Sequence, residues 1–187
     1  MGMNDELEES VLVLRCRIGD REALGQLIDR YYRRLRYFIG RLADGPEAVD
    51  DVLQETWLRA IAKLGTLRNA ESFKPWLYRI ARNEAYQHLR RKGAACEVHD
   101  ERDVPDEGRD EAFSAADAAR IHNGLGCLHP AHREILVLRF FEDMAYQQIA
   151  EVLGCGLNTV KTRLFYAKRA LKKEMEANHG NEHRSER

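Results

Sequence analysis

Apolar residues recur every three or four positions along most of the chain, and no long stretch alternates apolar and polar residues. A three-and-four spacing places side chains on one face of an α-helix, whereas a half-buried strand needs a period of two. Between residues 20 and 42 one apolar stripe consists of Ala23, Leu24, Leu27, Ile28, Tyr31, Leu35, Phe38 and Ile39. The pattern therefore predicts an all-α protein.

Glycine and proline divide the N-terminal half into further helices. Gly45-Pro46 interrupts the pattern, and Pro46 suits the first turn of the next helix, which Gly65 ends. A polar loop over 66–72 follows, and Ser72 is placed to cap another helix that runs to Arg91. The expected apolar side of the helix opened by Pro46 consists of Val49, Val52, Leu53, Trp57, Ala60, Ile61 and Leu64.

The composition changes after Gly93, where acids, Ala, Gly and Ser become frequent. We expect a flexible acidic linker over 93–124, with one short helix near 111–121. A second helical block follows over 125–177, and the last ten residues are expected to be frayed. The fold class predicted is thus two small helical domains, residues 10–92 and 125–177, joined by this linker.

The formal net charge of −1 hides a segregation of charge along the chain. Residues 15–92 carry 17 bases and 10 acids, and residues 126–177 carry eight bases and six acids. Between them, residues 93–125 carry three bases and nine acids. Two basic blocks around an acidic one suggest an anionic partner.

Residues 144–171 fit a helix-turn-helix. Gly154 permits the turn, Asn158 or Thr159 is placed to cap the second helix, and Gly156–Lys173 contains six bases and no acid. Such a helix suits the major groove of DNA. An ordinary helical hairpin with a solvated basic face is the alternative. The residues expected to face inward are Ile149, Ala150, Leu153, Val160, Leu164, Ala167 and Leu171.

Two polar faces in the first domain have simpler explanations than function. The helix opened by Pro46 turns Asp50, Asp51, Gln54, Glu55 and Leu58 away from its apolar stripe, and a solubilising face explains them on physical grounds alone. The next helix places bases and amides on one face, near Trp76. Such a face suits phosphates and unstacked bases, although Trp76 fits a plain core position equally well.

The segments DDVLQETWLRA, FKPWLYRIARNEAYQHLRRK and HREILVLRFFEDMAYQQIAEVLGCGLNTVKTRLFYAKRAL resemble, in order and spacing, the bacterial sigma-70 family. The short two-domain form is similar to its extracytoplasmic-function (ECF) group. The resemblance covers residues 10–92 and 125–173. It implies a sigma factor that binds core RNA polymerase and directs initiation at promoter DNA.

The resemblance also assigns roles to residues. Asp50, Asp51, Gln54, Glu55 and Leu58 match the surface that docks on the polymerase clamp coiled coil. The −10 element would be melted and recognised by Arg68, Asn69, Lys74, Trp76, Arg79, Asn83, Gln87, Arg90 and Arg91. The −35 element would be contacted by Asn158, Thr159, Lys161, Thr162, Arg163, Tyr166 and Arg169.

Two positions depart from the family's usual pattern. Gln87 stands where an Asp is usual, which alters the expected base preference without weakening phosphate contact. Tyr166 stands where an Arg is frequent, which puts one −35 contact in doubt.

The acidic linker has two explanations. It is either a solvated spacer, which we favour, or an inhibitor that competes with phosphate for the basic faces of the free protein. As a tether it would let two weak DNA sites act together.

No catalytic constellation is evident, so we expect no enzyme activity and no cofactor. Cys96 and His99, and the cluster His122, Cys127, His129 and His132, lack the spacing of zinc sites, so no metal is expected. Widely spaced cysteines, the absence of a long apolar run and an acidic N-terminus suggest reduced thiols in a cytoplasmic protein without membrane insertion.

Two other functional classes stay open, a stand-alone helix-turn-helix regulator and a metal-dependent enzyme or sensor. The first leaves DDVLQETW without a role, and the second needs the Cys and His side chains to converge. The resemblance further implies an anti-sigma factor as a partner, without identifying one.

Overall fold

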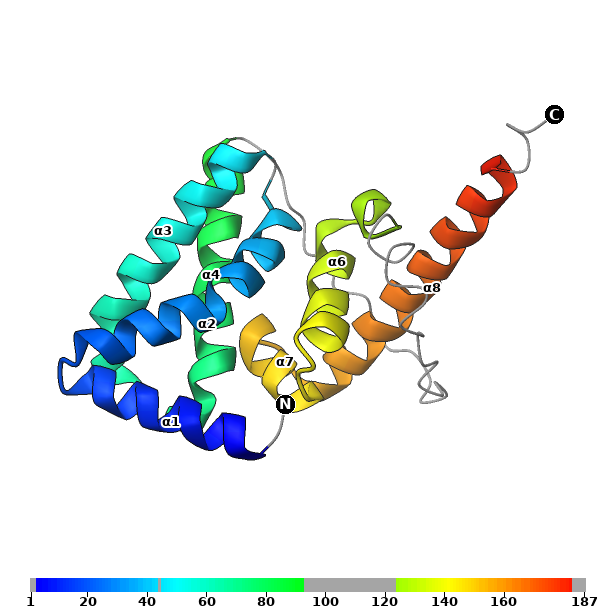
Figure 1. Cartoon of the computed structure of the whole chain (residues 1–187). Helices are drawn as coiled ribbons and strands as arrows, with labels where there is room; N and C mark the ends of the chain where they lie inside the picture. Colours follow the sequence, from blue (N-terminus) through cyan, green and yellow to red (C-terminus); the bar gives the residue numbers. More distant parts are fainter. Residues whose placement is uncertain (1–2, 44, 93–123, 183–187) are drawn as a thin grey trace. The chain divides into compact units, whose positions relative to one another are not determined.

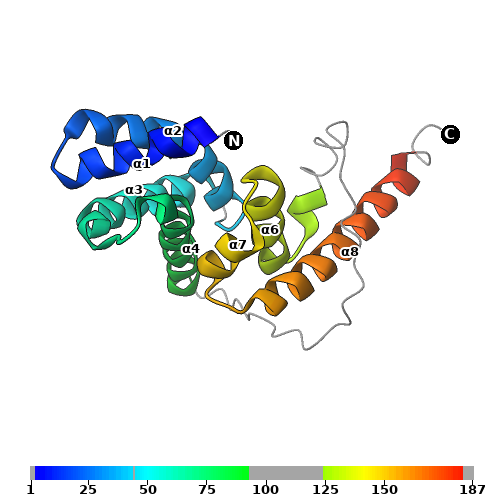
Figure 2. The same ribbon diagram turned by 90° about the horizontal axis from the view of Figure 1, so that it is seen from below.

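The computed structural model describes residues 3–43, 45–92 and 124–182, and the chain divides into two compact units. Every regular element in these ranges is helical, which confirms the all-α prediction and the two helical domains (Figures 1 and 2). The predicted linker over 93–123, with its short helix near 111–121, lies outside the described residues.

The N-terminal unit contains four α-helices. They are α1 (Met3–Arg17), α2 (Arg21–Gly40), α3 (Pro46–Lys63) and α4 (Phe73–Arg91), and the short 3-10 turns η1 (Leu64–Thr66) and η2 (Ala70–Ser72) connect α3 to α4. α2 packs against α1, α3 and α4. It is therefore the central helix of the unit.

The core of this unit forms where the predicted α2 stripe meets α4. Tyr31 and Phe38 are fully buried, and the Tyr31 ring contacts Phe73 and Tyr78 edge-on, with centroids 5.6 and 6.4 Å apart. The centroids of the Phe38 and Tyr78 rings are 5.2 Å apart. Aromatic pairs in these arrangements add to the free energy gained by burial, so α2 and α4 are held in a fixed relation.

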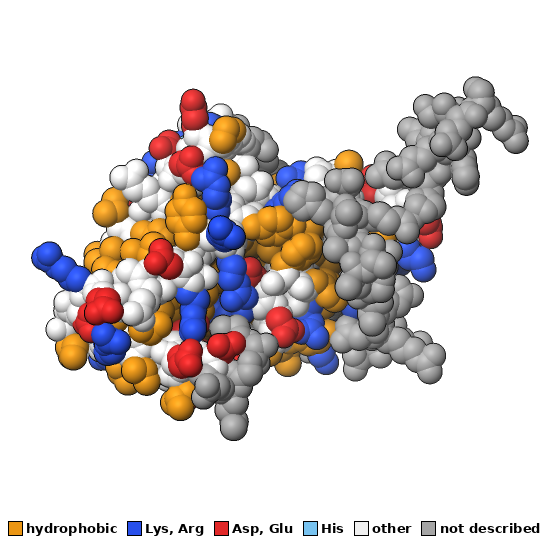
Figure 3. Space-filling model, viewed as in Figure 1, with side chains coloured by type: hydrophobic (Ala, Val, Ile, Leu, Met, Phe, Trp, Pro, Cys, Tyr) orange, Lys and Arg blue, Asp and Glu red, His pale blue; other side chains and the backbone are white. Residues whose placement is uncertain are grey.

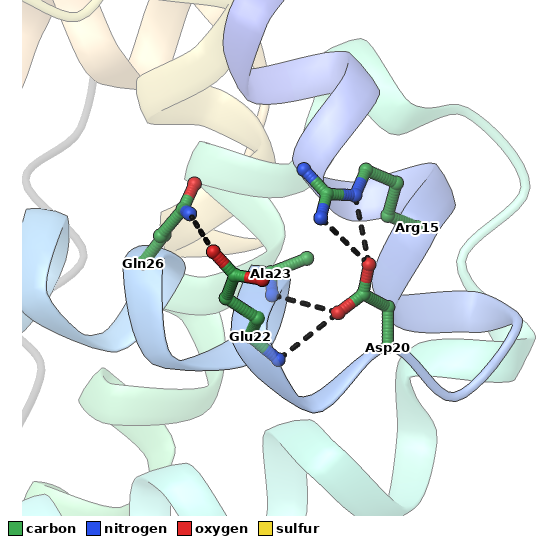
Figure 4. Close-up of polar contacts among 5 residues, drawn as sticks. All are labelled: Arg15, Asp20, Glu22, Ala23 and Gln26. Carbon is green, nitrogen blue, oxygen red and sulfur yellow. Dashed lines mark hydrogen bonds and ion pairs between the residues drawn. The ribbon is translucent and has the colours of Figure 1, made fainter.

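Asp20 fixes the turn between α1 and α2 (Figure 4). Its carboxylate accepts hydrogen bonds from the backbone N–H groups of Glu22 and Ala23 at 3.0 and 3.1 Å, and the Arg15 Nε donates to it at 2.8 Å. The Ala23 hydrogen bond, followed by that from Arg15, lowers the pKa of Asp20. Asp20 is thus both the N-cap of α2 and the ion-pair partner that ties α2 to α1.

The C-terminal unit carries the helix-turn-helix. Its elements are α6 (Pro130–Leu136), a π-helical turn, η4 (Val137–Phe141), α7 (Tyr146–Leu153) and α8 (Leu157–Glu182). Gly154 adopts a φ of +67°, a left-handed conformation that glycine tolerates best, between α7 and α8. All the residues predicted to face inward are buried, namely Ile149, Ala150, Leu153, Val160, Leu164, Ala167 and Leu171.

The sequence pattern did not predict α1, because its two faces are both apolar and no single stripe marked it. Predictions at the ends of two helices were wrong. Ser72 occupies the N-cap of α4 but makes no capping hydrogen bond with its side chain. α8 begins at Leu157, which places Asn158 and Thr159 inside its first turn, and it continues to Glu182 where a frayed tail was expected.

Candidate functional site

The exposed polar side of α3 is the first candidate surface. Asp50, Asp51, Gln54, Glu55 and Leu58 are all exposed, and we call this set the α3 surface. Leu58 is 55% exposed, so an apolar side chain sits among the acids and amide. Ile61, which the sequence pattern assigned to the core, is also exposed and extends the surface by one turn.

Ion pairs position the α3 surface on its neighbours. The Arg36 guanidinium on α2 pairs with Asp50, and this contact raises the pKa of Arg36 further above its already high value. Arg59 on the same helix pairs with Glu84 of α4, with the Arg59 Nε and the Glu84 Oε1 3.0 Å apart. Glu84 is only 3% exposed while Arg59 is 39% exposed, so the carboxylate lies inside the unit and the pair connects α3 to α4 at its edge.

A groove of about 280 Å³ runs between α3 and α4. Its walls combine acids of α3 with bases of α4, and its lining residues are Asp51, Val52, Gln54, Glu55, Glu84, His88, Arg91 and Lys92. The structure therefore brings Arg91, a predicted −10 contact, next to the α3 surface. Sequence reasoning missed His88 and Lys92, because a helix-helix groove depends on packing between segments.

The exposed side of α4 is the second candidate surface. Arg79, Asn83, Arg90 and Arg91 are exposed and Gln87 is half-buried, and we call this set the α4 face. Its members follow one another at three- and four-residue steps, apart from the adjacent pair at its end, as residues on one side of a helix do.

The remaining predicted −10 residues differ in accessibility. Trp76 is half-buried, with its ring centroid 5.8 Å from that of Phe73, so part of the ring packs on Phe73 and part stays accessible. Arg68 and Asn69 are exposed in the loop before α4, where the Asn69 Oδ1 accepts a hydrogen bond from the Glu71 N–H at 3.1 Å. Lys74 is only 7% exposed.

Lys74 belongs to a buried polar cluster rather than to the α4 face. It lies close enough to Glu9 of α1 to lower the pKa of that carboxyl, although burial, the larger effect, raises that pKa overall. The Tyr31 hydroxyl donates a hydrogen bond to Glu9, which is 6% exposed. Because this cluster joins α1, α2 and α4, we assign Lys74 a structural role.

The third candidate surface is the outer side of α8. Asn158, Lys161 and Arg169 are exposed, while Thr159, Thr162 and Tyr166 are half-buried, and we call this set the α8 face. Arg169 stacks over the Phe165 ring at 5.6 Å, which holds its guanidinium along the helix. Arg163 is only 8% exposed, so its side chain contributes mainly to packing.

The cysteine and histidine residues offer no metal centre in the part of the chain that the structure describes. No three Cys, His, Asp or Glu side chains there converge as metal ligands. His129 instead caps α6, because its Nδ1 accepts a hydrogen bond from the Ala131 N–H at 3.3 Å. Cys96, His99 and His122 lie outside the described residues.

Among the described helices, none combines the length and the apolar character that a membrane crossing requires.

Comparisons with known proteins agree with this geometry. The family Sigma-70 region 2 matches residues 27–95, and the family Sigma-70, region 4 matches residues 118–171. The first match covers α3 and α4, with the α3 surface and the α4 face, and the second covers the helix-turn-helix.

Individual relatives match almost the whole chain. It is 30% identical to the RNA polymerase sigma-H factor of Pseudomonas aeruginosa over 182 residues, covering 90% of this chain and 94% of that protein. It is 27% identical to the ECF RNA polymerase sigma-E factor of Salmonella typhimurium, covering 90% and 95%. The structure of CnrH in complex with the cytosolic domain of CnrY matches with a TM-score of 0.68 and 25% identity, covering 91% of this chain and 98% of that one. The chain therefore belongs to the sigma-70 family of RNA polymerase sigma factors, in its extracytoplasmic-function group.

Proposed function

We propose that the chain binds core RNA polymerase through the α3 surface and directs it to promoters through the α4 face and the α8 face. The observation that carries the proposal is the direct attachment of α3 to α4 through the ion pair between the half-buried Arg59 and the buried Glu84. An acidic docking surface and a basic face on adjacent, locked helices hold the DNA at a fixed place relative to the polymerase. Residues 10–92 thus bind the polymerase and the −10 element, residues 125–177 bind the −35 element, and the linker over 93–124 tethers the two domains.

The α4 face suits a melted −10 element. Its arginines supply phosphate contacts, and Asn83 offers an amide to the edge of an extruded base, with Asn69 exposed in the preceding loop. Flipping one base costs a few kcal/mol of unstacking, which amide hydrogen bonds and aromatic contacts offset. Trp76 retains enough exposure to provide such a contact.

The α8 face suits duplex DNA at the −35 element. The first turns of the second helix of a helix-turn-helix lie closest to the base edges in the major groove. Asn158, Lys161 and Thr162 occupy these turns, and Tyr166 and Arg169 follow on the same side. Tyr166 can donate one hydrogen bond but carries no positive charge, so the salt dependence of binding rests on Lys161 and Arg169.

The chain acts by binding, and the chemistry belongs to the polymerase, so we assign it no enzyme activity, no cofactor and a place in the cytoplasm beside the polymerase. An anti-sigma protein is a further partner. Its support is the relative CnrH, which was solved together with the cytosolic domain of another protein.

Transcription from a library of genomic fragments by core polymerase, with and without the chain, tests the proposal. We expect the chain to create a small set of start sites that share −35 and −10 sequences. Glu55→Lys should abolish these starts and polymerase binding in a pull-down, while Asp29→Lys, an exposed acid on α2, should preserve both. A chain that binds DNA but starts no transcript is a stand-alone regulator, and that result contradicts the proposal.

Asn83→Ala tests promoter melting separately from polymerase binding. We expect it to reduce permanganate reactivity of thymines in the −10 region while polymerase binding and −35 duplex binding stay unchanged. Equal melting by this variant and the wild type would refute the role of Asn83.

A further inference from the structure

α1 carries an apolar stripe that no role assigned so far uses. Leu7, Val11, Leu14 and Ile18 are 65%, 47%, 52% and 86% exposed, and Ile18 directly follows the last residue of the helix. Hydrophobic side chains are visible along the edge of the N-terminal unit that α1 forms (Figure 3). Contiguous exposed apolar residues of this kind mark interaction surfaces.

The stripe lies opposite the side by which α1 is attached. Glu9 and Val13, half a helical turn away, are 6% and 0% exposed, and Glu9 is hydrogen-bonded to Tyr31 of α2. α1 is therefore already ordered on the unit, and a partner on its outer side gains apolar contact without the entropic cost of forming the helix.

The spacing of the stripe identifies its type. Steps of four, three and four residues from position 7 to position 18 are the steps of a coiled-coil seam, with Leu7 and Leu14 at d and Val11 and Ile18 at a. In an antiparallel pair of helices a residues face d residues. A second copy of α1 places Ile18 against Leu7 and Leu14 against Val11, so the seam is complementary to itself about a two-fold axis.

The charges beside the seam favour the same orientation. Glu8 and Arg15 occupy the e positions, which face one another in an antiparallel pair, so each Glu8 meets the Arg15 of the other copy. In a parallel pair e positions face g positions instead, and the g position opposite Arg15 is Ser10, so Arg15 would gain no acidic partner. Their side chains are 58% and 41% exposed, so each retains free surface beyond its contact with Arg30 or Asp20 in its own chain.

A groove beside the stripe enlarges the contact. It measures about 610 Å³ and lies between α1 and α2, lined by Leu7, Glu8, Val11, Leu12, Arg15, Gln26, Asp29 and Arg30. From the self-complementary seam, the paired charges and this groove, we infer that the chain self-associates through α1 as an antiparallel, two-fold symmetric dimer. A standard interface buries about 800 Å² on each partner, more than two short heptads supply, so we expect a weak dimer.

Sedimentation velocity of the full chain, over a series reaching hundreds of micromolar, tests the inference. We expect the mass to rise from monomer towards dimer. Val11→Glu and Leu14→Lys should each raise the Kd at least tenfold, and Ile61→Glu, a matched exposed apolar residue on α3, should leave it unchanged. Circular dichroism of each variant checks that the helices are intact.

Mixing the two variants tests the register. Position 11 of one copy faces position 14 of the other, so Val11→Glu protein and Leu14→Lys protein should associate with each other more tightly than either does with itself. A wild-type chain that stays monomeric throughout overturns the inference, and so does a dimer that both variants leave intact. A mixture no tighter than the separate variants overturns the antiparallel register.

Discussion

Replacing Arg59 with Met tests whether the Arg59–Glu84 pair holds α3 and α4 together. The Glu84 carboxylate is 3% exposed, its Oε1 lies 3.0 Å from the Arg59 Nε, and its Oε2 has no hydrogen-bond partner among the residues that the structure describes. Met keeps much of the apolar stem of Arg59 but leaves the carboxylate without its cation. Removing one partner of a fully buried pair costs about 3–5 kcal/mol. Because Arg59 is 39% exposed and water screens part of the interaction, we expect about 2 kcal/mol.

Tryptophan fluorescence measures this loss in the intact chain. Both tryptophans of the protein, Trp57 and Trp76, lie in the N-terminal unit, so their signal follows the unfolding of that unit alone. For a domain of this size, about 2 kcal/mol lowers the Tm by about 10 °C. Arg68→Met, which removes an exposed loop arginine, should change the Tm by far less.

A double-mutant cycle separates the interaction energy of the pair from the effect of each single substitution. Arg59→Met together with Glu84→Met removes both charges and leaves apolar side chains between α3 and α4. That variant should recover most of the stability lost in Arg59→Met, because no uncompensated charge stays buried. If Arg59→Met is no less stable than the Arg68→Met control, or if the double variant is as unstable as Arg59→Met, the pair does not lock the helices and the reasoning fails.

Three further predictions concern other charges. Asp20→Ala should lower the Tm of the N-terminal unit at neutral pH. Because the pKa of Asp20 is lowered in the fold, this difference should shrink as the pH falls from 3.8 through that lowered pKa, and a difference that does not shrink would contradict the prediction. Glu9→Gln should keep an acceptor for the Tyr31 hydroxyl and stabilise the unit at pH 7; because burial raises the pKa of Glu9, the gain should disappear below pH 4.5, as urea unfolding at several pH values can show. Lys161→Ala should reduce the slope of log K against log salt for a −35 duplex by about 0.9, whereas Lys173→Ala, on another side of α8, should not.

The sequence pattern predicts the buried helices best. The α2 stripe and the inward side of the helix-turn-helix were identified because their neighbours cover one face only, and one stripe then carries the period of the helix. The pattern did not predict α1, because this helix is apolar on the side of Val13 and again on the side of Leu7 and Val11. A second apolar side weakens the contrast between apolar and polar faces by which a single buried stripe is recognised.

Basic residues show where prediction from sequence ends. The family resemblance placed Lys74 and Arg163 among the DNA contacts, yet they are only 7% and 8% exposed. For Lys74 the reason is long-range, since Glu9 approaches from α1 only after the chain has folded. The assignments to polymerase and promoter for the remaining residues stay predictions, and they rest on exposure and charge.

The arrangement of the N-terminal unit makes its surfaces separable by mutation. α2 contributes the buried centre, whereas α1, α3 and α4 each contribute one outward side, namely the seam, the α3 surface and the α4 face. Charges are screened over about 8 Å at physiological salt, so a partner responds to the local surface and hardly to the net charge of −1. Leu14, Glu55 and Asn83 lie on α1, α3 and α4. A change at one of them should therefore impair only the interaction of its own helix: self-association, polymerase binding or promoter melting. A cavity at Phe38, buried between α2 and α4, should weaken all three together.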